Sequence, residues 1–342
     1  MAHANTTATA YAQTNIALIK YWGKRHGIDA AGHSLNLPAT GSLSMTLAEF
    51  GTQTTVELVD DDEDRFVLDG EEIAAGEAAR VSAFLDLLRE RAGNSRRCLV
   101  TSRNDVPTAA GLASSASAFA ALTEAANAAF DLDLDEKERS ILSRRGSGSA
   151  ARSVFGGFVR MHKGELDDGN DSFAEPVLVH DELDLKLIVV QCAQGRKKIG
   201  STVGMNRTSN TSPYFQAWID THDDDLQLCM KALAEGDFTS VGESMEHSTL
   251  KMHASAMAAQ PGLWYFAPTS LAVLNEVTRL RDDGASCYFT MDAGPHVKVL
   301  CRASEVEELE DELAKVEGVQ HIRSSAVGQG ARVLEKSVLK AG

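Results

Sequence analysis

Hydrophobic residues recur at strand spacing over the first part of the chain. Residues 10–22 are mostly apolar and extended in character, and residues 42–59 alternate between apolar and polar in two runs on either side of Gly51. We expect these segments to form an antiparallel sheet. A helical spacing of apolar residues follows over 77–92, and residues 97–103 predict a strand that leads into a glycine-containing loop.

The helix expected after this loop is rich in Ala and Ser. It runs to about Phe130, a second helix is expected over 135–145, and the segment SRRGSGSAARS ends that helix. Residues 154–162 then predict a strand with a glycine bend. Strands and helices in this order predict one layer of sheet covered by one layer of helices, which is an α+β arrangement.

The hydrophobic pattern restarts at Leu185 with the buried strand LKLIVVQC, and this change marks the expected domain boundary. We therefore divide the chain into residues 1–185 and 186–342. The second part predicts helices at 210–235, 237–257, 269–283 and 304–316, and strands at CYFTMDA, VKVLCRA and 318–324. Their order is typical of a ferredoxin-like domain.

Composition and charge narrow the classes of function. The chain has 342 residues, 43% of them hydrophobic and 24% charged, which is the profile of a globular protein with one large or two ordinary domains. Its net charge of -16 argues against a nucleic-acid binder, because such proteins present a basic surface. A small anionic substrate is compatible with this charge where basic residues converge locally.

The sequence also predicts the cellular compartment. No basic N-terminal region precedes an apolar run, and no window approaches the ~18 apolar residues of a membrane helix. The five cysteines form no CxxC pair and are expected to be buried reduced thiols. We therefore expect a cytoplasmic protein that does not bind a membrane.

The segment from Asp105 to Leu122, DVPTAAGLASSASAFAAL, has the composition of a phosphate-binding loop. Pro107 ends an extended stretch, Gly111 turns the chain, and small side chains leave the start of the following helix open to a polyanion. The spacing matches neither a Walker loop nor GxGxxG. A small-residue helix packed tightly on a sheet is the alternative interpretation.

Two further segments combine basic residues with glycine. NIALIKYWGK, residues 15–24, carries Lys20 and Lys24 around an awkward Trp-Gly strand ending, although a core strand with two surface lysines would have the same pattern. RRGSGSAARS, residues 144–153, places arginines beside small residues with exposed N–H groups and hydroxyls. It predicts an anion-binding turn, and a flexible turn is the alternative.

Two segments of the second half are also candidates. Residues 195–207, GRKKIGSTVGMNR, hold a dense positive charge in an acidic chain and predict contact with an anionic ligand. In MDAGPH, Asp292 ends an apolar strand before Gly-Pro, where it can either cap a turn or take part in catalysis. The histidines show no spacing typical of a metal site.

Together these segments resemble the diphosphomevalonate decarboxylase family of the GHMP kinase superfamily. The resemblance covers nearly the whole chain and rests on NIALIKYWGK, LNLPATGSLSMTL, VPTAAGLASSAS, RRGSGSAARS, STVGMNRTSNTSP and TMDAGP. It implies an α+β GHMP kinase two-domain fold, with a ribosomal protein S5 domain 2-like N-terminal domain and a ferredoxin-like C-terminal domain. The implied reaction is the ATP- and Mg²⁺-dependent decarboxylation of mevalonate 5-diphosphate to isopentenyl diphosphate, by a homodimer.

The resemblance also implies roles for individual residues. Asp292 is the implied catalytic base, with Lys20 beside it. The residues implied to bind the substrate are Tyr21, Lys24, Ser147, Ser149, Arg152 and Ser201. The residues implied to bind ATP are Pro107, Ala110, Gly111, Ala113, Ser114, Ser115 and Ser117. No Mg²⁺ ligand is assigned, because phosphate oxygens and water often supply most of them.

The chemistry of the reaction agrees with these roles. A 3-hydroxy acid has no carbonyl group to accept electrons during decarboxylation, so ATP is needed to turn the tertiary hydroxyl into a leaving group. Positive character then develops at C3, where a carboxylate such as Asp292 can stabilise it. The cationic segments are expected to orient the anionic groups of the substrate and of ATP.

The chain departs from the family pattern at two positions. Ala151 stands where the family often has Cys, and His296 stands where it often has Asn, so both are expected to affect affinity or substrate choice. Two other functions are the alternatives: a decarboxylase of mevalonate 5-phosphate, and a non-catalytic sensor of the same fold. The presence of both Lys20 and Asp292 favours a decarboxylase.

Overall fold

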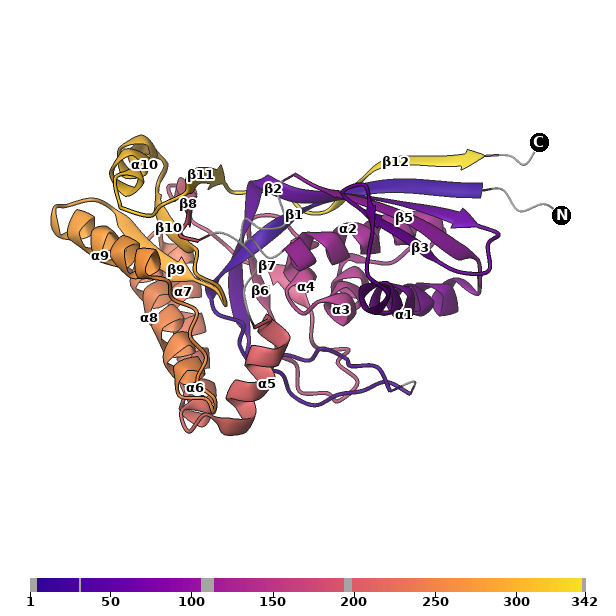
Figure 1. The fold of residues 1–342 in the computed structure, drawn as a ribbon, viewed down its shortest axis with the longest axis horizontal. Coiled ribbons are helices and arrows are strands. Elements are labelled where there is room, and N and C mark those ends of the chain that lie inside the picture. Colours follow the sequence, from indigo (N-terminus) through magenta and orange to yellow (C-terminus); the bar gives the residue numbers. More distant parts are fainter. Residues whose placement is uncertain (1–4, 31, 106–113, 194–198, 340–342) are drawn as a thin grey trace.

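The computed structural model describes residues 5–30, 32–105, 114–193 and 199–339 of the chain. It contains two β-sheets, each with helices packed against it (Figure 1). This arrangement confirms the predicted α+β class.

Within the described residues, the first sheet has eight strands with the main order β12-β1-β2-β5-β3-β4, and β6 pairs with both β2 and β7. The strands are β1 (Asn5–Ile19), β2 (Ser42–Val59), β3 (Arg65–Leu68), β4 (Glu71–Glu72), β5 (Arg97–Asn104), β6 (Phe158–Met161), β7 (Ala174–Pro176) and β12 (Arg332–Leu339). The two runs expected around Gly51 form one continuous strand, β2. Gly51 serves a close approach rather than a turn, because a Cβ there would lie 2.3 Å from the Tyr11 hydroxyl.

The helices of the N-terminal half lie along one side of the first sheet (Figure 1). They are α1 (Ala75–Ala92), α2 (Ser114–Ala129), α3 (Glu136–Gly146) and α4 (Ala150–Ser153). α2 packs on β1 and β2, and its fully buried Ala116 and Ala120 permit that close contact. α3 begins with a capping box, in which Asp135 accepts a hydrogen bond from the backbone N–H of Glu138 and the Glu138 side chain accepts one in return.

The second sheet has the order β11-β8-β10-β9, with all pairs antiparallel. Its strands are β8 (Leu185–Gln191), β9 (Cys287–Met291), β10 (Val297–Arg302) and β11 (His321–Ala326). Counted along the chain, this is the order fourth, first, third, second, which belongs to a ferredoxin-like sheet. The predicted C-terminal fold is therefore confirmed.

Helices cover both faces of the second sheet. Those packed on it are α7 (His222–Glu235), α8 (Phe238–Met257), α9 (Pro268–Asp282) and α10 (Val306–Ala314), the last preceded by the short η1 (Ala303–Glu305). α5 (Ser201–Thr211) packs against α8, and α6 (Phe215–Asp220) packs against α7 and α8. Side chains of β8 alternate between the two faces. Leu187 packs with residues of α7 and α8, whereas Val190 packs with Val273 of α9 and Leu309 of α10.

The two halves are joined through shared packing and through the last strand. Ile16 and Leu43 of the first sheet lie in one apolar cluster with Leu187 of the second. β12 crosses back and pairs antiparallel with β1, with Tyr11 opposite Arg332 (Figure 1). The division into 1–185 and 186–342 stays a prediction, and the return of β12 to the first sheet was not part of it.

Other sequence expectations concern the cysteines and the membrane. All five cysteines are buried and free, as predicted. Among the helices in the described ranges, none combines the length and the apolar character needed to cross a bilayer.

Candidate active site

A cavity of about 520 Å³ collects the predicted substrate-binding residues from distant parts of the chain. Its lining includes Lys20, Tyr21, Lys24, Ser147, Ser149, Arg152, Ser201 and Asp292. They come from the segment after β1, from the turn around α4, from the first residue of α5 and from the end of β9. The fold therefore brings together every residue that the sequence assigned to catalysis and substrate binding.

The carboxylate of Asp292 is held between two lysines. The Nζ atom of Lys20 lies 2.8 Å from Oδ1, and the Nζ atom of Lys298 lies 3.0 Å from Oδ2. Lys20 also donates to the carbonyl oxygen of Ala17 at 2.8 Å. Both lysines are buried, whereas the Asp292 side chain is 34% exposed at the cavity.

Lys298 was missed at the sequence level. The strand VKVLCR is otherwise apolar and buried, so the signal was a lone lysine in a core strand close to Asp292. Such a lysine needs a buried anion or acceptor as a partner. The available partner was the acid that ends the preceding strand.

Burial and neighbouring charges together set the protonation states of this cluster. Burial alone would raise the pKa of Asp292, but the charges of Lys20 and Lys298 outweigh it and hold that pKa well below its usual range. Burial lowers the pKa of Lys20 to about 8, against the opposing effect of Asp292. At neutral pH the carboxylate is therefore ionised.

Arg152 presents a second buried cation to the cavity. Its Nη1 donates to Ser42 Oγ at 2.6 Å and its Nε to Asn15 Oδ1 at 3.3 Å, and both partners are neutral. Within the described residues, no carboxylate lies at ion-pair distance from Arg152. Burial lowers the pKa of this guanidinium to about 10, so it remains charged at neutral pH and is available to an anion.

The two arginines that precede the GSGS turn differ in role, and only Arg144 departs from the anion-binding expectation. Arg144 is fully buried and donates to the carbonyl oxygens of Leu35, Gly169 and Ser172, so it ties loops together and does not line the cavity. Arg145 pairs with Asp29. Of this segment, Ser147, Ser149 and Arg152 line the 520 Å³ cavity, and Arg145 lines a second cavity beside it.

A second cavity of about 610 Å³ adjoins the first, and Lys24, Asn36, Arg80 and Thr202 line both. Arg145 and His33 line only the second. Lys24 donates to Asn36 Oδ1 at 2.7 Å, and Asn36 in turn donates to the carbonyl oxygen of Arg145 at 2.7 Å. Burial, with a contribution from Arg80, lowers the pKa of Lys24 to about 8.

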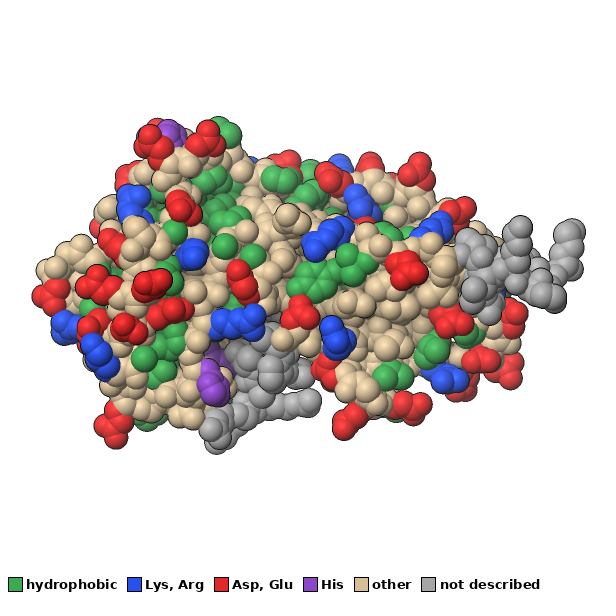
Figure 2. Space-filling model, turned by 90° about the horizontal axis from the view of Figure 1, so that it is seen from above, with side chains coloured by type: hydrophobic (Ala, Val, Ile, Leu, Met, Phe, Trp, Pro, Cys, Tyr) green, Lys and Arg blue, Asp and Glu red, His purple; other side chains and the backbone are tan. Residues whose placement is uncertain are grey.

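Positive charge in these cavities contrasts with the outer surface. Figure 2 shows Asp and Glu side chains scattered over one face of the molecule, with Lys and Arg between them. The 520 Å³ cavity is lined by the four cations Lys20, Lys24, Arg80 and Arg152 and by the two carboxylates Glu77 and Asp292. The 610 Å³ cavity has the cations Lys24, Arg80 and Arg145 and no carboxylate among the described residues that line it. Local convergence of basic residues is what an acidic chain needs to bind an anion.

The predicted ATP site is only partly described. Pro107, Ala110, Gly111 and Ala113 lie outside the described residues, and Ser114 begins α2. Ser115 lines the 520 Å³ cavity and also a neighbouring one of about 300 Å³. Ser117 is buried and hydrogen-bonds with Thr52 of β2 at 2.7 Å, so it faces the sheet.

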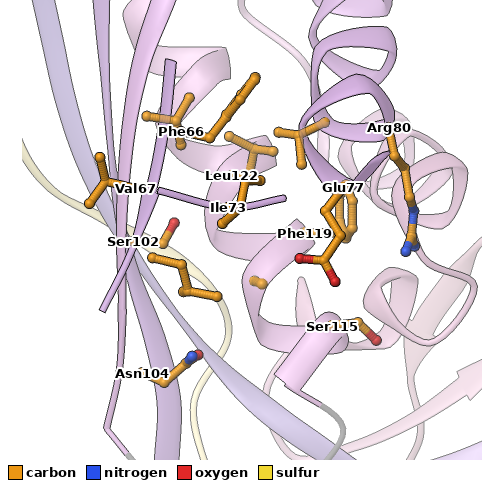
Figure 3. A pocket seen from close by; sticks show the side chains of 14 residues that line it. Phe66, Val67, Ile73, Glu77, Arg80, Ser102, Asn104, Ser115, Phe119 and Leu122 are labelled. Carbon is orange, nitrogen blue, oxygen red and sulfur yellow. The ribbon is translucent and has the colours of Figure 1, made fainter. Parts of the chain in front are cut away.

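The 300 Å³ cavity lies between α1, α2 and the strands β3 and β5 (Figure 3). Its labelled apolar walls are Phe66, Val67, Ile73, Phe119 and Leu122. Ser102, Asn104 and Ser115 supply polar groups (Figure 3). Glu77 and Arg80 line both this cavity and the 520 Å³ cavity. An apolar slot with a few polar groups suits a flat heterocyclic ring. Sequence periodicity did not predict this cavity.

The basic segment 195–207 and the possible metal ligands are the remaining candidates, and the segment adds no described residue with a charged side chain to the 520 Å³ cavity. Arg196, Lys197 and Lys198 lie outside the described residues, and Arg207 donates to the carbonyl oxygen of Pro261 at 3.4 Å without lining the 520 Å³ cavity. The described residues contain no cluster of three or more His, Cys, Asp and Glu able to hold a metal ion. Magnesium usually takes only one or two carboxylates from a protein, together with phosphate oxygens and water.

The two departures from the family pattern lie behind the cavity wall. Ala151 is fully buried in an apolar cluster with residues such as Ala12 and Ala120. His296 accepts a hydrogen bond at Nδ1 from the backbone N–H of Cys192 at 3.1 Å, and burial lowers its pKa to about 4. Neither residue lines the 520 Å³ cavity, so their effect on affinity or substrate choice remains a prediction.

Comparison with known proteins agrees with this geometry. Residues 12–174 match the diphosphomevalonate decarboxylase-like N-terminal domain, and residues 187–337 match the mevalonate 5-diphosphate decarboxylase C-terminal domain. The phosphomevalonate decarboxylase of Haloferax volcanii is 35% identical, over 96% of this chain and 98% of its own length.

Solved structures extend the match to three dimensions. The mevalonate diphosphate decarboxylase of Staphylococcus aureus is 40% identical with a TM-score of 0.90, over 97% of this chain and 98% of that one. A structure described as MDDEF in complex with MVAPP, AMPPCP and magnesium is 40% identical with a TM-score of 0.89, over 97% and 99% of the two chains. The predicted GHMP kinase two-domain fold agrees with both matches. The chain belongs to the diphosphomevalonate decarboxylase family.

Proposed function

We propose that this chain is an enzyme that decarboxylates mevalonate 5-diphosphate to isopentenyl diphosphate, with ATP and Mg²⁺, and releases ADP, phosphate and carbon dioxide. The reaction belongs to the mevalonate pathway of isoprenoid synthesis. The observation that carries the proposal is the convergence of Lys20, Arg152 and Asp292 on one cavity, in a member of this family.

The cavity offers matching partners for an anionic substrate. Arg152 and Lys24 supply positive charge, and the hydroxyls of Ser147, Ser149 and Ser201 line the same cavity. The Tyr21 hydroxyl is buried and has no hydrogen-bond partner among the described residues, so it is available to accept or donate one when a ligand binds. We assign these residues to the phosphates and the carboxylate of the substrate.

The 300 Å³ cavity is our proposed site for the base of ATP. Its apolar walls suit an adenine ring, and Ser115 links it to the substrate cavity at the start of α2. Backbone N–H groups and the helix dipole at such a start favour phosphate. When bound with Mg²⁺, ATP supplies the phosphoryl group that makes the substrate hydroxyl a leaving group.

Asp292 is the residue that we assign to the reacting carbon. It can accept the proton of the 3-hydroxyl, as a positioned carboxylate does in general base catalysis. Because its pKa lies far below neutral, it is a weak proton acceptor before the hydroxyl begins to react. Its fixed negative charge also stabilises the positive charge that develops at C3 as carbon dioxide leaves.

A second candidate function is decarboxylation of mevalonate 5-phosphate. The relative from Haloferax volcanii carries the name phosphomevalonate decarboxylase, and it matches this chain over almost its full length. The adjoining 610 Å³ cavity supports the diphosphate instead, because it provides space and the cations Arg80 and Arg145 beyond Lys24.

One assay separates the candidates. The purified protein is given ATP and Mg²⁺ with either mevalonate 5-diphosphate or the 5-phosphate, and both ADP and carbon dioxide are measured. We expect equal amounts of both products and a higher kcat/KM for the diphosphate. A higher kcat/KM for the monophosphate would establish the second function. Production of ADP without carbon dioxide would reduce the claim to a kinase, and tight binding without turnover would indicate a sensor.

Cellular location and assembly complete the proposal. Buried cysteines without disulfides suit a reducing compartment, which supports a cytoplasmic location. The homodimer rests on the family resemblance. Light scattering coupled to gel filtration measures the mass of the assembly in solution, and a mass equal to one chain would contradict a dimer.

A further inference from the structure

Lys298 lies on the far side of Asp292 from the substrate cavity. It projects from β10 of the second sheet, whereas Lys20 follows β1 of the first sheet. Lys20 lines the 520 Å³ cavity and Lys298 does not. The two lysines therefore approach one carboxylate from different parts of the fold, and only Lys20 can reach a bound ligand.

Folding alone does not account for a lysine at this position. Its neighbours Val297, Val299, Leu300 and Cys301 on β10 are apolar and buried, and Lys298 is only 1% exposed. Its Nζ atom has two acceptors in reach, Asp292 Oδ2 at 3.0 Å and the carbonyl oxygen of His296 at 3.4 Å. Burying a charge costs free energy even when it is paired, and an apolar side chain would avoid that cost.

Several ionisable groups surround Asp292, and they differ in charge near neutral pH. Around Asp292 stand Lys20 after β1, Arg152 of α4 and Lys298 of β10, together with His253 of α8. Burial lowers the pKa of His253 to about 4, and that of His296 beside Lys298 also to about 4, so both imidazoles are neutral near pH 7. Lys298 is thus the cation that contacts Asp292 Oδ2 without lining the substrate cavity.

We propose that Lys298 is a positioning residue for the decarboxylation: it fixes Oδ2 of Asp292 and keeps the carboxylate charged, which leaves Lys20 free to turn its N–H groups toward the substrate. This inference rests on the proposed function. A bound substrate carboxylate or hydroxyl can replace Asp292 as a partner of Lys20, because Lys20 and Asp292 both line the cavity. Without Lys298, that exchange would leave Asp292 with neither lysine and free to rotate.

The test uses the full-length protein with Lys298→Met, Lys298→Arg and, as a matched control in the same sheet, Lys186→Met. We expect Lys298→Met to lower kcat by about 10- to 100-fold, the range found when a residue that orients a metal-binding side chain is lost. The KM for ATP should stay within about twofold, and Lys298→Arg should recover most of the rate because it keeps the charge. A merely structural role would lower the yield of folded enzyme without these differences.

The pH profile gives a readout that packing alone would not move. In the parent enzyme, Asp292 stays ionised throughout the range from pH 5 to 9. In Lys298→Met, kcat should fall toward the acid end of that range, as the carboxylate becomes protonated at higher pH. Parent-like kcat and pH dependence in Lys298→Met, or equal losses in the Met and Arg variants, would overturn the proposal.

A second measurement does not depend on turnover. Protein labelled with ¹³C at the aspartate carboxyls is titrated by NMR, and the Asp292 signal is assigned by its loss in Asp292→Asn. We expect the pKa of Asp292 to rise in Lys298→Met and to remain low in Lys298→Arg and Lys186→Met. If the parent enzyme fails to decarboxylate, the proposed function fails, and this titration still decides whether Lys298 controls Asp292. Lys298→Gln replaces the Met variant if the latter does not fold.

Discussion

A β-carbon on Gly148 would lie 2.3 Å from the hydroxyl oxygen of Tyr21, so the Tyr21 side chain fits in its place only because residue 148 has no side chain. Gly148→Ala should push the Tyr21 ring or the GSGS turn out of place, since overpacking typically costs about 1–3 kcal/mol. We expect the KM for mevalonate 5-diphosphate to rise about tenfold or more. Gly76→Ala, where nothing lies within 4 Å of the added carbon, is the control. Equal KM values for the two variants would contradict the argument.

Asp292→Asn should lower turnover by at least ~10²-fold, on the order of 2.7 kcal/mol, because the fixed negative charge and the proton acceptor are both lost. Release of carbon dioxide under saturating substrate measures the effect. Asp225→Asn is the matched control, because Asp225 also pairs with a lysine, Lys251, at 2.6 Å but does not line the cavity. An Asp292 variant as active as the Asp225 variant would remove Asp292 from the reaction.

Arg145 lines the 610 Å³ cavity beyond Lys24, which is where we place the distal phosphate of the substrate. Arg145→Met should therefore raise the KM for mevalonate 5-diphosphate about tenfold, equivalent to ~1.4 kcal/mol, with a much smaller effect on the 5-phosphate. Arg25→Met removes an arginine of the same region that does not line this cavity. Equal changes for the two substrates would show that Arg145 does not distinguish them.

Substrate capture should weaken in alkali. Lys20 and Lys24 have pKa values lowered to about 8, so both are charged below that pH and lose their protons as the pH rises through it. Because kcat/KM reports the ionisation of the free enzyme, its logarithm should fall above pH 8 with a slope approaching two. In Lys24→Arg one of these groups no longer titrates, and the slope should approach one. A flat profile between pH 7 and 9.5 would contradict this assignment.

Local patterns in the sequence predicted much of the fold. Strand alternation and helical spacing located most elements, and the strand order of the second sheet followed from the order of its elements along the chain. The prediction of two strands on either side of Gly51 was wrong, because Gly51 accommodates the Tyr11 ring and does not turn the chain, so β2 is continuous. Such a contact joins two strands and leaves no local periodicity.

The candidate site was predictable where a segment carries several functional residues. Lys20, Arg152 and Asp292 were named from their motifs, and the structure gathers them at one cavity. Lys298 was missed because a single lysine in an apolar strand has meaning only beside the acid that it contacts. The anion-binding role expected for Arg144 was wrong for a related reason. Its partners are carbonyl groups of loops far away in the sequence, and no local motif predicts such contacts.

The pairing of β12 with β1 also sets an order of events during synthesis. β1 leaves the ribosome long before β12, so one edge of its residues 5–11 receives a neighbour only when Arg332–Leu339 has emerged. Until then the edge of a long strand stays exposed, and exposed strand edges invite pairing with other chains. Because β12 pairs only with residues 5–11, the edge that waits for it lies at the start of β1, and the end of β1 that leads into Lys20 does not depend on that late pairing.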